Sequence, residues 1–391
     1  LPIIYQHRIA LAMTFTQISG RKQYLPELDG LRAIAVLLVI TAHMQSAIFN
    51  RLVGRLGVTI FFVLSGYLIT FLSLGEEFEN GSLGFCGFYI RRIFRICPLY
   101  YFVLGLYCFL ILGLHISPDK QLRLVVALPY YIFYFQEIPF LGMDAGQTLP
   151  FYQSWSLGIE EKFYLLWPAL CFLILRHKTR FRIPVAIVLM GTMSFSRYTR
   201  PYISILFGCV LALCFEFPFL KKSVQRVAGV GSWVSLCLLV AFQVIVMPGW
   251  KWAYAGLVYS AAFCIFLALL LTSENIIKRV LATRQLVFFG KMSYGIYLIH
   301  VLCISALPNK LHFQNPVGGF LIVCSISLAI ATAMHYMIEK PFINFGRSLS
   351  QKFETTGGAT SLQSKNLTAN GLPVAVTPVP VPSVQASVSQ V

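Results

Sequence analysis

The sequence predicts an all-α, polytopic membrane protein, and two observations carry this prediction. Of the 391 residues, 57% are hydrophobic and only 12% are charged, which is about half the charge of a soluble domain. Apolar runs of roughly twenty residues, long enough to cross a bilayer as a helix, recur along the whole chain. The net charge of +17 is therefore read as a membrane signal, because cytoplasmic loops of membrane proteins are rich in Lys and Arg.

Three regions follow one another along the chain. Residues 1–23 are expected to form an N-terminal arm at the membrane interface, because their apolar patch is too short for a signal sequence. Residues 24–345 are expected to form one membrane domain with about ten transmembrane helices. Their expected spans are 31–49, 56–74, 98–115, 157–175, 183–196, 202–216, 230–247, 252–271, 285–306 and 317–338. Residues 346–391 turn to Ser, Thr, Pro and Val, which predicts a disordered cytoplasmic tail.

The apolar stretch 122–140 is ambiguous, and the basic loops decide how it is read. If both termini are cytoplasmic and this stretch does not cross, four basic loops fall on the cytoplasmic side, as the positive-inside rule requires. If it crosses, the last three of them move outside. The loops are Arg91/Arg92/Arg95, Arg176/Lys178/Arg180/Arg182, Lys221/Lys222/Arg226 and Lys278/Arg279/Arg284. We therefore expect 122–140 to be re-entrant or to lie along the outer surface.

The first long apolar helix carries two ionisable residues, which are expensive in hydrocarbon. Arg32 stands at its mouth, and His43 follows eleven residues later. This spacing puts both side chains on one helix face, about 16 Å apart along the axis. One end of the helix could hold an anion at the membrane surface while the other performs proton chemistry. A snorkelling arginine and a hydrogen-bonded packing histidine are the alternative.

A basic group is expected near the cytoplasmic face, in and around the run FYIRRIFRICP. Two of its arginines are spaced i,i+4 and a third lies beside them. Arginine is the residue that captures phosphate with two parallel hydrogen bonds, so the group predicts a phosphate site. Contact with anionic lipid head groups is the alternative. The residues concerned are Asp29, Arg32, Arg91, Arg92 and Arg95.

Three ionisable residues on separate spans are expected at a similar depth in the outer half of the membrane: His43, Glu160 and His300. Glu160 lies in QSWSLGIEEKFYLLWP, and His300 ends SYGIYLIH, in which Tyr297 shares its helix face. Ser65, in FFVLSGYLIT, is read as a small residue that permits close helix approach rather than as a nucleophile. A nucleophilic serine needs a base beside it.

Two classes of site are not indicated. The ten cysteines are scattered singly, without a CxxC pair or a His/Cys cluster, so no metal site and no disulfide framework is expected. No nucleic-acid partner is expected either, because membrane topology accounts for the positive charge.

Taken together, these stretches resemble the acyltransferase family 3 of integral membrane proteins, which acylate sugars and other hydroxyl-bearing envelope or secreted molecules. The resemblance rests on LDGLRAIAVLLVITAH, FFVLSGYLI, RRIFRICP, WSLGIEEKFYLLWP, KMSYGIYLIH and EKPF, which follow in the family's order between about residues 24 and 345. It implies a membrane domain of ten helices. Some relatives append an extracytoplasmic esterase-like domain, whereas only the tail is expected here.

The resemblance also implies roles for the polar residues. His43 matches the essential histidine and would be the general base, Arg32 its paired arginine, and Glu160 the acid that orients the imidazole. The cytoplasmic arginine motif would hold the phosphates of an acyl-CoA donor, most often acetyl-CoA, and it matches Arg91, Arg92 and Arg95. Supporting residues are expected at Asp29, Ser65, Tyr297 and His300. Direct transfer and a covalent relay both stay open.

The expected function is transfer of an acyl group from cytoplasmic acyl-CoA to a hydroxyl of an envelope or exported glycan, in the inner membrane with both termini cytoplasmic. The acceptor would be a carbohydrate or a lipid-linked glycan, with membrane lipids around the protein. Two alternatives are a proton-coupled transporter and a non-catalytic component of polysaccharide export. Inverted repeats would favour the transporter, and none is evident. The acceptor, the acyl chain and the oligomeric state stay open.

Overall fold

The computed structural model describes residues 24–44, 46–142, 149–249, 254–306 and 315–353. Within these residues it contains helices and turns and no strand, so the predicted all-α class is confirmed. The longer helices are α2 (Pro26–His43), α4 (Leu56–Asn80), α5 (Phe85–Cys108), α6 (Pro118–Ile132), α8 (Trp155–Pro168), α9 (Arg182–Met193), α10 (Arg200–Cys214), α11 (Pro218–Ala241), α12 (Ala255–Thr272), α14 (Arg284–Ser305) and α16 (Pro316–Met334). Short helices are α3 (Ala47–Asn50), α7 (Glu137–Gly142) and α13 (Ile276–Leu281).

Four of the long helices continue through π-helical turns. These turns are η1 (Phe109–Gly113) after α5, η3 (Ala169–Ile174) after α8, η5 (Phe242–Val246) after α11 and η7 (His335–Glu339) after α16. The short 3-10 segments are η2 (Tyr152–Ser154), η4 (Thr179–Phe181) and η6 (Met247–Gly249). Beyond η7 the helix runs on to Phe353, so it extends past the domain boundary expected at residue 345. The expected arm 1–23 and the tail from residue 354 lie outside the described residues.

Six helices in the described part of the chain are long and apolar enough to cross a membrane. They are Leu56–Asn80, Phe85–Gly113, Pro218–Gly249, Ala255–Thr272, Arg284–Ser305 and Pro316–Phe353. The other four expected spans fall on α2, α8, α9 and α10, which are shorter or carry several charges. The structure thus supports a multi-pass membrane protein, while the count of about ten spans stays a prediction.

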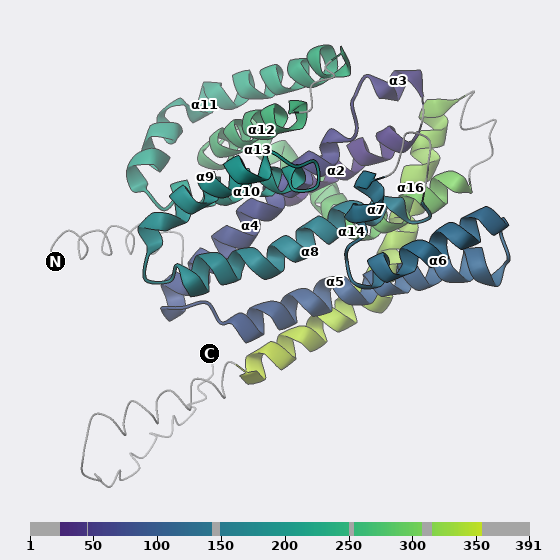
Figure 1. Cartoon of the computed structure of the whole chain (residues 1–391). Coiled ribbons are helices and arrows are strands. Elements are labelled where there is room, and N and C mark those ends of the chain that lie inside the picture. The colour runs from purple at the N-terminus through teal and green to yellow at the C-terminus, as the bar shows by residue number, and fades with distance from the viewer. Residues whose placement is uncertain (1–23, 45, 143–148, 250–253, 307–314, 354–391) are drawn as a thin grey trace, which may run out of the picture.

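Ion pairs between helices mark one end of the bundle. Glu76 and Glu77, late in α4, pair with Arg91 of α5 and Arg182 of α9. We call this the Arg91 end. The opposite end, which we call the His43 end, carries the last turn of α2 and the first turn of α4. Figure 1 shows α11 and α12 along one edge of the bundle, with α5 and the yellow helix that continues α16 to Phe353 along the other.

Two glycines allow helices to touch backbone to backbone. A Cβ on Gly66 would lie 1.9 Å from the Ile205 carbonyl oxygen, and one on Gly290 would lie 1.9 Å from the Asp29 carbonyl oxygen. Any side chain there would push α4 from α10, or α14 from α2. The interpretation of the Ser65–Gly66 pair as a close-packing step is therefore confirmed for its glycine.

The ambiguous stretch 122–140 is not one continuous helix. Its first part lies in α6, which folds back against α5: the Tyr100 hydroxyl donates to the Tyr131 carbonyl at 2.9 Å, and the Tyr101 hydroxyl to the Ile132 carbonyl at 2.8 Å. Tyr134 then has a φ of 59°, a left-handed conformation that interrupts the helix before α7 begins. This break fits a stretch that does not cross the membrane, as the charge distribution predicts.

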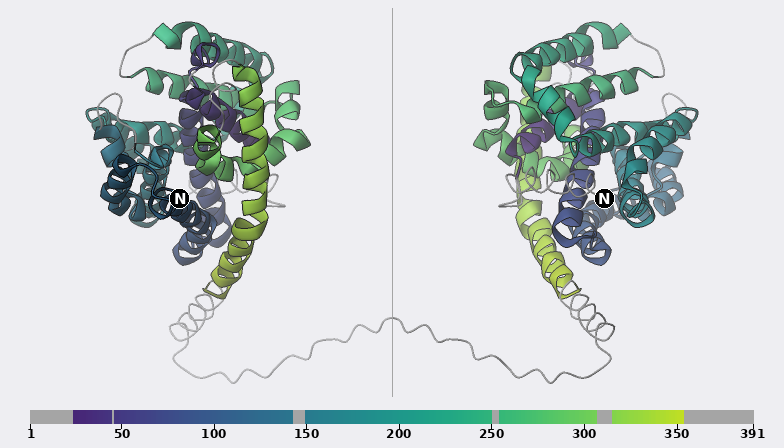
Figure 2. Two further views of the ribbon diagram at one scale, coloured as in Figure 1. Left: turned by 90° about the vertical axis from the view of Figure 1, so that its right-hand side faces the viewer. Right: turned by 90° about the vertical axis from the view of Figure 1, so that its left-hand side faces the viewer.

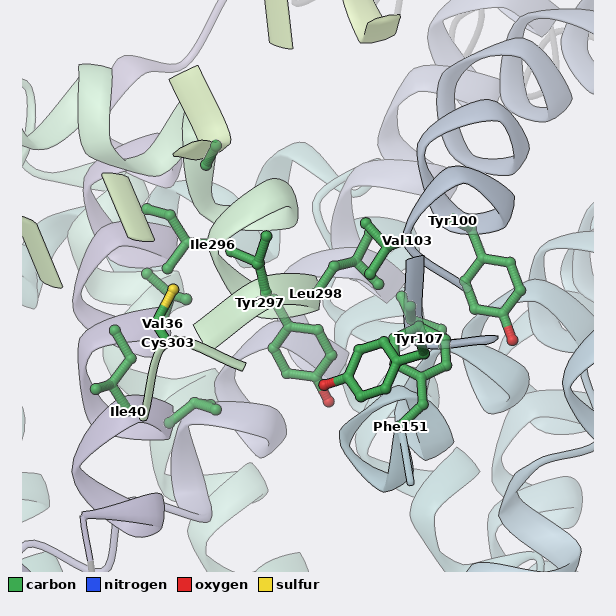
Figure 3. Close-up of a cluster of buried hydrophobic side chains, with 14 of the residues drawn as sticks. Val36, Ile40, Tyr100, Val103, Tyr107, Phe151, Ile296, Tyr297, Leu298 and Cys303 are labelled. Carbon is green, nitrogen blue, oxygen red and sulfur yellow. The ribbon is translucent and has the colours of Figure 1, made fainter. Parts of the chain in front are cut away.

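A buried apolar cluster fixes α2, α5 and α14 to one another. It includes Val36 and Ile40 of α2, Val103 of α5, and Ile296 and Leu298 of α14, all at most 1% exposed. Figure 3 shows this cluster together with the rings of Tyr100, Tyr107 and Phe151, which extend it toward the loop before α8. The final helix runs along the outside of the bundle, as Figure 2 shows. Because α2 and α14 are held at this point, their polar residues can be placed accurately against each other.

Candidate active site

A cavity opens at the Arg91 end and is walled by α2, α4, α5, α8, α14 and η7. Its empty space, counted to the open mouth, is about 760 Å³. Four cationic side chains line it: Arg32, Arg92, Arg95 and Lys291. The carboxyl groups of Glu160, Glu161 and Glu339 line it as well. The arginines expected to hold phosphate are thus brought into one cavity from two helices, α2 and α5, with a single exception.

The exception is Arg91. Its guanidinium donates to Glu76 Oε2 at 2.9 Å and to Ser350 Oγ at 2.7 Å, and it is absent from the cavity lining. It joins α5 to the end of α4 and to the end of the final helix. The structure therefore splits the predicted arginine group: Arg92 and Arg95 face the cavity, and Arg91 faces a carboxylate.

Two of the three cavity arginines, Arg92 and Arg95, lack anionic partners among the described residues. The Arg92 guanidinium lies over the Tyr164 ring, 4.5 Å from its centroid, and 5.9 Å from that of Phe88. Arg95 is an exposed residue, and the contacts of the described residues give its guanidinium no ion pair and no hydrogen bond. A guanidinium held in a cavity without a carboxylate partner can accept an anionic ligand without first giving up another bond.

Arg32 lies at the same cavity, paired loosely with Asp29 at 3.9 Å. Asp29 also accepts a hydrogen bond from the Tyr24 hydroxyl at 2.5 Å. The Asp29 carboxylate is therefore engaged beside the mouth of the cavity rather than inside it. Both residues lie in the first two turns of α2, which begins at Pro26, five residues before the expected span.

Glu160 lies deeper in the cavity and is bonded to two hydroxyl groups. Its Oε2 accepts from the Tyr164 hydroxyl at 2.7 Å and from the Ser65 hydroxyl at 3.2 Å. The expected contact between Glu160 and the His43 imidazole is not among the contacts of the described residues. Ser65 is 5% exposed, and its neighbour is a carboxylate rather than a histidine. Glu160 therefore ties α8 to α4.

His43 instead meets His300. The two rings lie edge to face, with centroids 4.8 Å apart and planes at 71°. His43 Nδ1 is 2.8 Å from the Val39 carbonyl oxygen and 3.3 Å from His300 Nε2. His300 Nδ1 is 2.8 Å from the Tyr297 carbonyl oxygen. The two histidines, which the sequence places at a similar depth, are therefore in direct contact.

The hydrogen-bond partners assign the tautomers of both rings. A carbonyl oxygen only accepts, so the Nδ1 atoms of His43 and His300 both carry hydrogen. His300 Nε2 is then an acceptor for the shared Nδ1 hydrogen of His43. This leaves the lone pair of the His43 ring on Nε2. An imidazole held in this way by its other nitrogen is ready to take a proton at Nε2.

A buried polar network extends from the cavity toward the histidine pair. The Tyr297 hydroxyl lines the cavity, donates to the Gln153 carbonyl at 2.6 Å and lies 2.7 Å from Ser156 Oγ. The Gln153 side-chain amide donates to the Tyr107 hydroxyl at 2.7 Å. Figure 3 shows the hydroxyl groups of Tyr297 and Tyr107 directed toward one another. The Tyr297 ring lies 5.8 Å from that of His300. The network therefore ends one helical turn from the histidines.

Three of these residues were missed in the sequence, namely Gln153, Ser156 and Lys291. Gln153 and Ser156 stand in the same run as Glu160, and an argument from spacing had no reason to choose them over their neighbours. Lys291 opens the run KMSYGIYLIH near the start of the expected span 285–306, where a cation at the membrane surface is ordinary. Among the described residues, no three His, Cys, Asp or Glu side chains gather as a metal site would require.

Comparisons with known proteins agree with this architecture. The family model described as "Acyltransferase domain" matches residues 25–336. Peptidoglycan O-acetyltransferase OatA of Listeria monocytogenes is 28% identical over 366 residues, which cover 85% of this chain and 58% of the relative. A candidate O-acetyltransferase of Staphylococcus aureus (strain COL) is 31% identical over 357 residues, which cover 82% of this chain and 58% of the relative.

The chain therefore spans less than two thirds of the length of these relatives. No solved structure matches it. The family model covers the stretch from the start of α2 to the first residues of η7, and this stretch holds the arginines of the cavity, Glu160 and the histidine pair. The match thus confirms the resemblance seen in the sequence motifs, and the chain belongs to the acyltransferase family 3.

Proposed function

We propose that the protein is a membrane O-acyltransferase that moves an acyl group, most simply acetyl, from acyl-CoA to a hydroxyl of a glycan. One observation carries this proposal. A single cavity has guanidiniums without an anionic partner among the described residues near its mouth, and a hydroxyl network at its deep end. Neither histidine lines this cavity, but the Tyr297 ring of the network lies 5.8 Å from the ring of His300, which contacts His43. An acyl-CoA carries its phosphates at one end and its thioester at the other, so it needs a phosphate site and a reaction site that lie apart.

The donor is held by charge at the mouth. Arg92 and Arg95 bind the phosphates of coenzyme A in bidentate fashion, with Arg32 and Lys291 nearby on the facing helices. The acyl thioester then extends toward Tyr297 and Ser156. This arrangement puts the reactive carbon at the deep end of the cavity without a cation beside it.

His43 acts as the general base. Its Nε2 takes the proton of the acceptor hydroxyl as the oxygen attacks the thioester carbon, and the thiolate of coenzyme A leaves. His300 is a positioning residue: it accepts from His43 Nδ1 and so keeps the lone pair on Nε2. Glu160 positions Tyr164 beneath Arg92 through its hydrogen bond and therefore supports the donor site rather than the imidazole.

The orientation follows from the charges. The basic clusters at the start of α5, before α9, in the first turns of α11 and around α13 lie at the Arg91 end, so we place that end in the cytoplasm, with both termini there and ten spans in all. The acyl-CoA cavity then opens to the cytoplasm. Labelling from outside intact cells of a cysteine introduced at Lys178 would contradict this orientation, whereas labelling at Arg51 is expected.

The acceptor is proposed to be a glycan of the cell envelope. OatA of Listeria monocytogenes carries peptidoglycan in its name, and YrhL of Bacillus subtilis, 30% identical over 365 residues covering 84% of this chain and 57% of the relative, is named as a candidate enzyme of the same kind. Mass spectrometry of envelope glycans from deletion and complemented strains tests this choice. Glycans with identical acylation in both strains would rule out an envelope acceptor.

The test of the mechanism is His43→Gln in the purified full chain. This variant keeps a polar side chain of similar size but cannot accept the proton, so acyl transfer is expected to fall by about 10²–10⁴-fold, the usual cost of losing a general base. Coenzyme A affinity, measured by equilibrium binding, should stay near that of the wild type, because the arginines are untouched. Near-normal transfer by His43→Gln would show that His43 only packs and that the base lies elsewhere.

A further inference from the structure

A second cavity lies at the His43 end of the bundle, where α4, α10 and α12 begin. Its empty space, counted to the open mouth, is about 1450 Å³. It is lined by Arg55 before α4, by Arg197 between α9 and α10, by Arg200 at the start of α10, and by Trp155 at the start of α8. We call it the outer cavity, because the proposed orientation puts this end outside the cytoplasm.

Within the part of the chain that the structure describes, the three arginines of the outer cavity have no anionic partner. Among the described residues that line it there is no Asp and no Glu. Arg197 donates to the Tyr198 hydroxyl at 3.3 Å, and Arg200 donates to the Ser194 carbonyl at 3.4 Å from both Nε and Nη2. The contacts of the described residues show no hydrogen bond or ion pair for the Arg55 guanidinium. Three guanidiniums thus share one cavity with neutral partners only.

Stacking holds two of these guanidiniums in place. Arg197 lies 5.1 Å from the centroid of the Tyr198 ring and Arg200 lies 4.5 Å from that of Tyr254. A stacked guanidinium keeps the N–H groups at its edge available for another partner. The positive-inside rule disfavours arginines at the outer end of a membrane protein, so their gathering there needs a reason other than topology.

The outer cavity adjoins the donor cavity across two helices. On α8, Trp155 lines the outer cavity and the next residue, Ser156, lines the donor cavity. On α4, Phe62 lines the outer cavity and its neighbour Phe61 the donor cavity. The rings of Phe62 and Trp155 meet edge to face with centroids 6.1 Å apart. One layer of aromatic side chains therefore separates the two cavities.

A row of aromatic rings leads from the outer cavity to the proposed base. Trp155 stacks on Phe140, with centroids 4.9 Å apart and planes at 11°. Phe140 stacks on Tyr152, with centroids 6.5 Å apart. Tyr152 in turn lies 5.7 Å from the His43 ring. Three successive ring contacts thus connect the wall of the outer cavity at Trp155 to His43.

We propose that the outer cavity is an acceptor subsite that binds a phosphate group carried by the acceptor. The inference rests on the proposed function, since it gives the second substrate its own entrance on the opposite end from acyl-CoA. Each guanidinium presents five N–H donors in a fixed fork. Three such forks exceed what the two oxygens of one carboxylate can accept, while a phosphate or diphosphate offers enough oxygens.

The test measures binding of radiolabelled inorganic pyrophosphate to the full chain in phosphatidylcholine nanodiscs. Saturating coenzyme A is present so that the donor cavity is already filled. Saturable binding is expected for the wild type, and Arg197→Gln/Arg200→Gln should weaken it at least about tenfold, because charge-assisted hydrogen bonds contribute about 1.5–3 kcal/mol each. Arg51→Gln is the matched control: it is an exposed arginine at the same end that does not line the cavity, and it should bind as the wild type does.

Two results would overturn the inference. One is the absence of saturable pyrophosphate binding, or equal binding by the double variant and the wild type. The other comes from nanodiscs that contain phosphatidylglycerol. If that lipid displaces pyrophosphate from the wild type, the cavity holds a lipid head group, whereas unchanged binding supports an acceptor. If the double variant is unstable, Arg55→Gln replaces it, because that residue lies in an exposed turn.

Coenzyme A affinity in the same nanodiscs keeps the two proposals apart. If the wild type fails to bind coenzyme A, the proposed function fails at the donor cavity, whatever the outer cavity binds. If coenzyme A binds and pyrophosphate does not, only the acceptor subsite is excluded. Normal coenzyme A affinity in the double variant also shows that its fold is intact.

Discussion

Two sets of arginines lie at the same end of this bundle, and their surroundings differ completely. Arg182 is 2% exposed, forms two 2.7 Å hydrogen bonds with Glu77 and lies over the Phe172 ring at 4.7 Å. Arg95 lies in a cavity and has no anionic partner among the described residues. A count of basic residues by loop treats the two alike.

The difference separates cations that hold the fold from cations that await a ligand. The charge of Arg182 is compensated by the protein itself, so its removal leaves the Glu77 carboxylate partly buried and alone. Arg95 forms no ion pair among the described residues, so its N–H groups are available to an anion that enters the cavity. Variants of the two sets should therefore differ in kind: one should lose stability, the other affinity.

The largest expected effect is on stability, from Arg182→Met. Breaking a buried ion pair on one side typically costs about 3–5 kcal/mol, so a clear fall in the thermal unfolding temperature in detergent is expected. Coenzyme A affinity of the protein that remains folded should not change. The control is Arg182→Met/Glu77→Leu, which removes both charges and should recover much of the loss. A double variant no more stable than the single one would contradict this assignment.

The second effect is on donor affinity, from Arg95→Ala. Loss of charge-assisted hydrogen bonds to phosphate, at about 1.5–3 kcal/mol, should weaken coenzyme A binding at least about tenfold. The unfolding temperature should hardly change, because no bond within the protein is broken. Arg95→Lys should recover only part of the affinity, since the fork is lost. Unchanged coenzyme A binding by Arg95→Ala would falsify the assignment of Arg95 as a phosphate ligand of coenzyme A.

The smallest effect is expected from Arg91→Ala. Arg91 belongs to the predicted phosphate-binding group by sequence, but it forms an ion pair within the protein as Arg182 does. Its pair with Glu76 is partly exposed, with side-chain exposures of 35% and 21%, so a loss of about 0.2–1 kcal/mol is expected in unfolding measurements. Coenzyme A affinity should stay within a few-fold of the wild type. A loss as large as that of Arg95→Ala would place Arg91 back among the phosphate ligands.

Most of the helices could be predicted from the sequence, because an apolar run of about twenty residues by itself indicates a membrane-spanning helix. The described residues of each expected span lie mostly in a helix, and the break in 122–140 agrees with the charge distribution. The first expected span, 31–49, was too long, because α2 ends at His43. The end of the last helix could not be predicted from the sequence. Residues 346–353 continue it although they are polar, because the helix packs on α5 there, with Phe345 against Phe94 at 5.1 Å between ring centroids.

The site residues were found by type and spacing, but their partners were not. The sequence placed His43, Glu160 and His300 at one depth, and the structure joins only the two histidines. Glu160 turns instead to Ser65 and Tyr164. Which neighbour a side chain reaches depends on how helices far apart in the sequence are rotated and tilted, and no single segment contains that information.

The π-helical turn η7 gives the final helix a phase that a regular α-helix would not have. Such a turn accommodates one extra residue, and one residue corresponds to about 100° of rotation about the helix axis. Residues before η7 pack in the bundle, while Glu339 at its end lines the donor cavity and Ser350 accepts from Arg91. Deleting one residue here would turn 340–353 away from α5, so the length of this turn, more than its composition, determines which residues face α5.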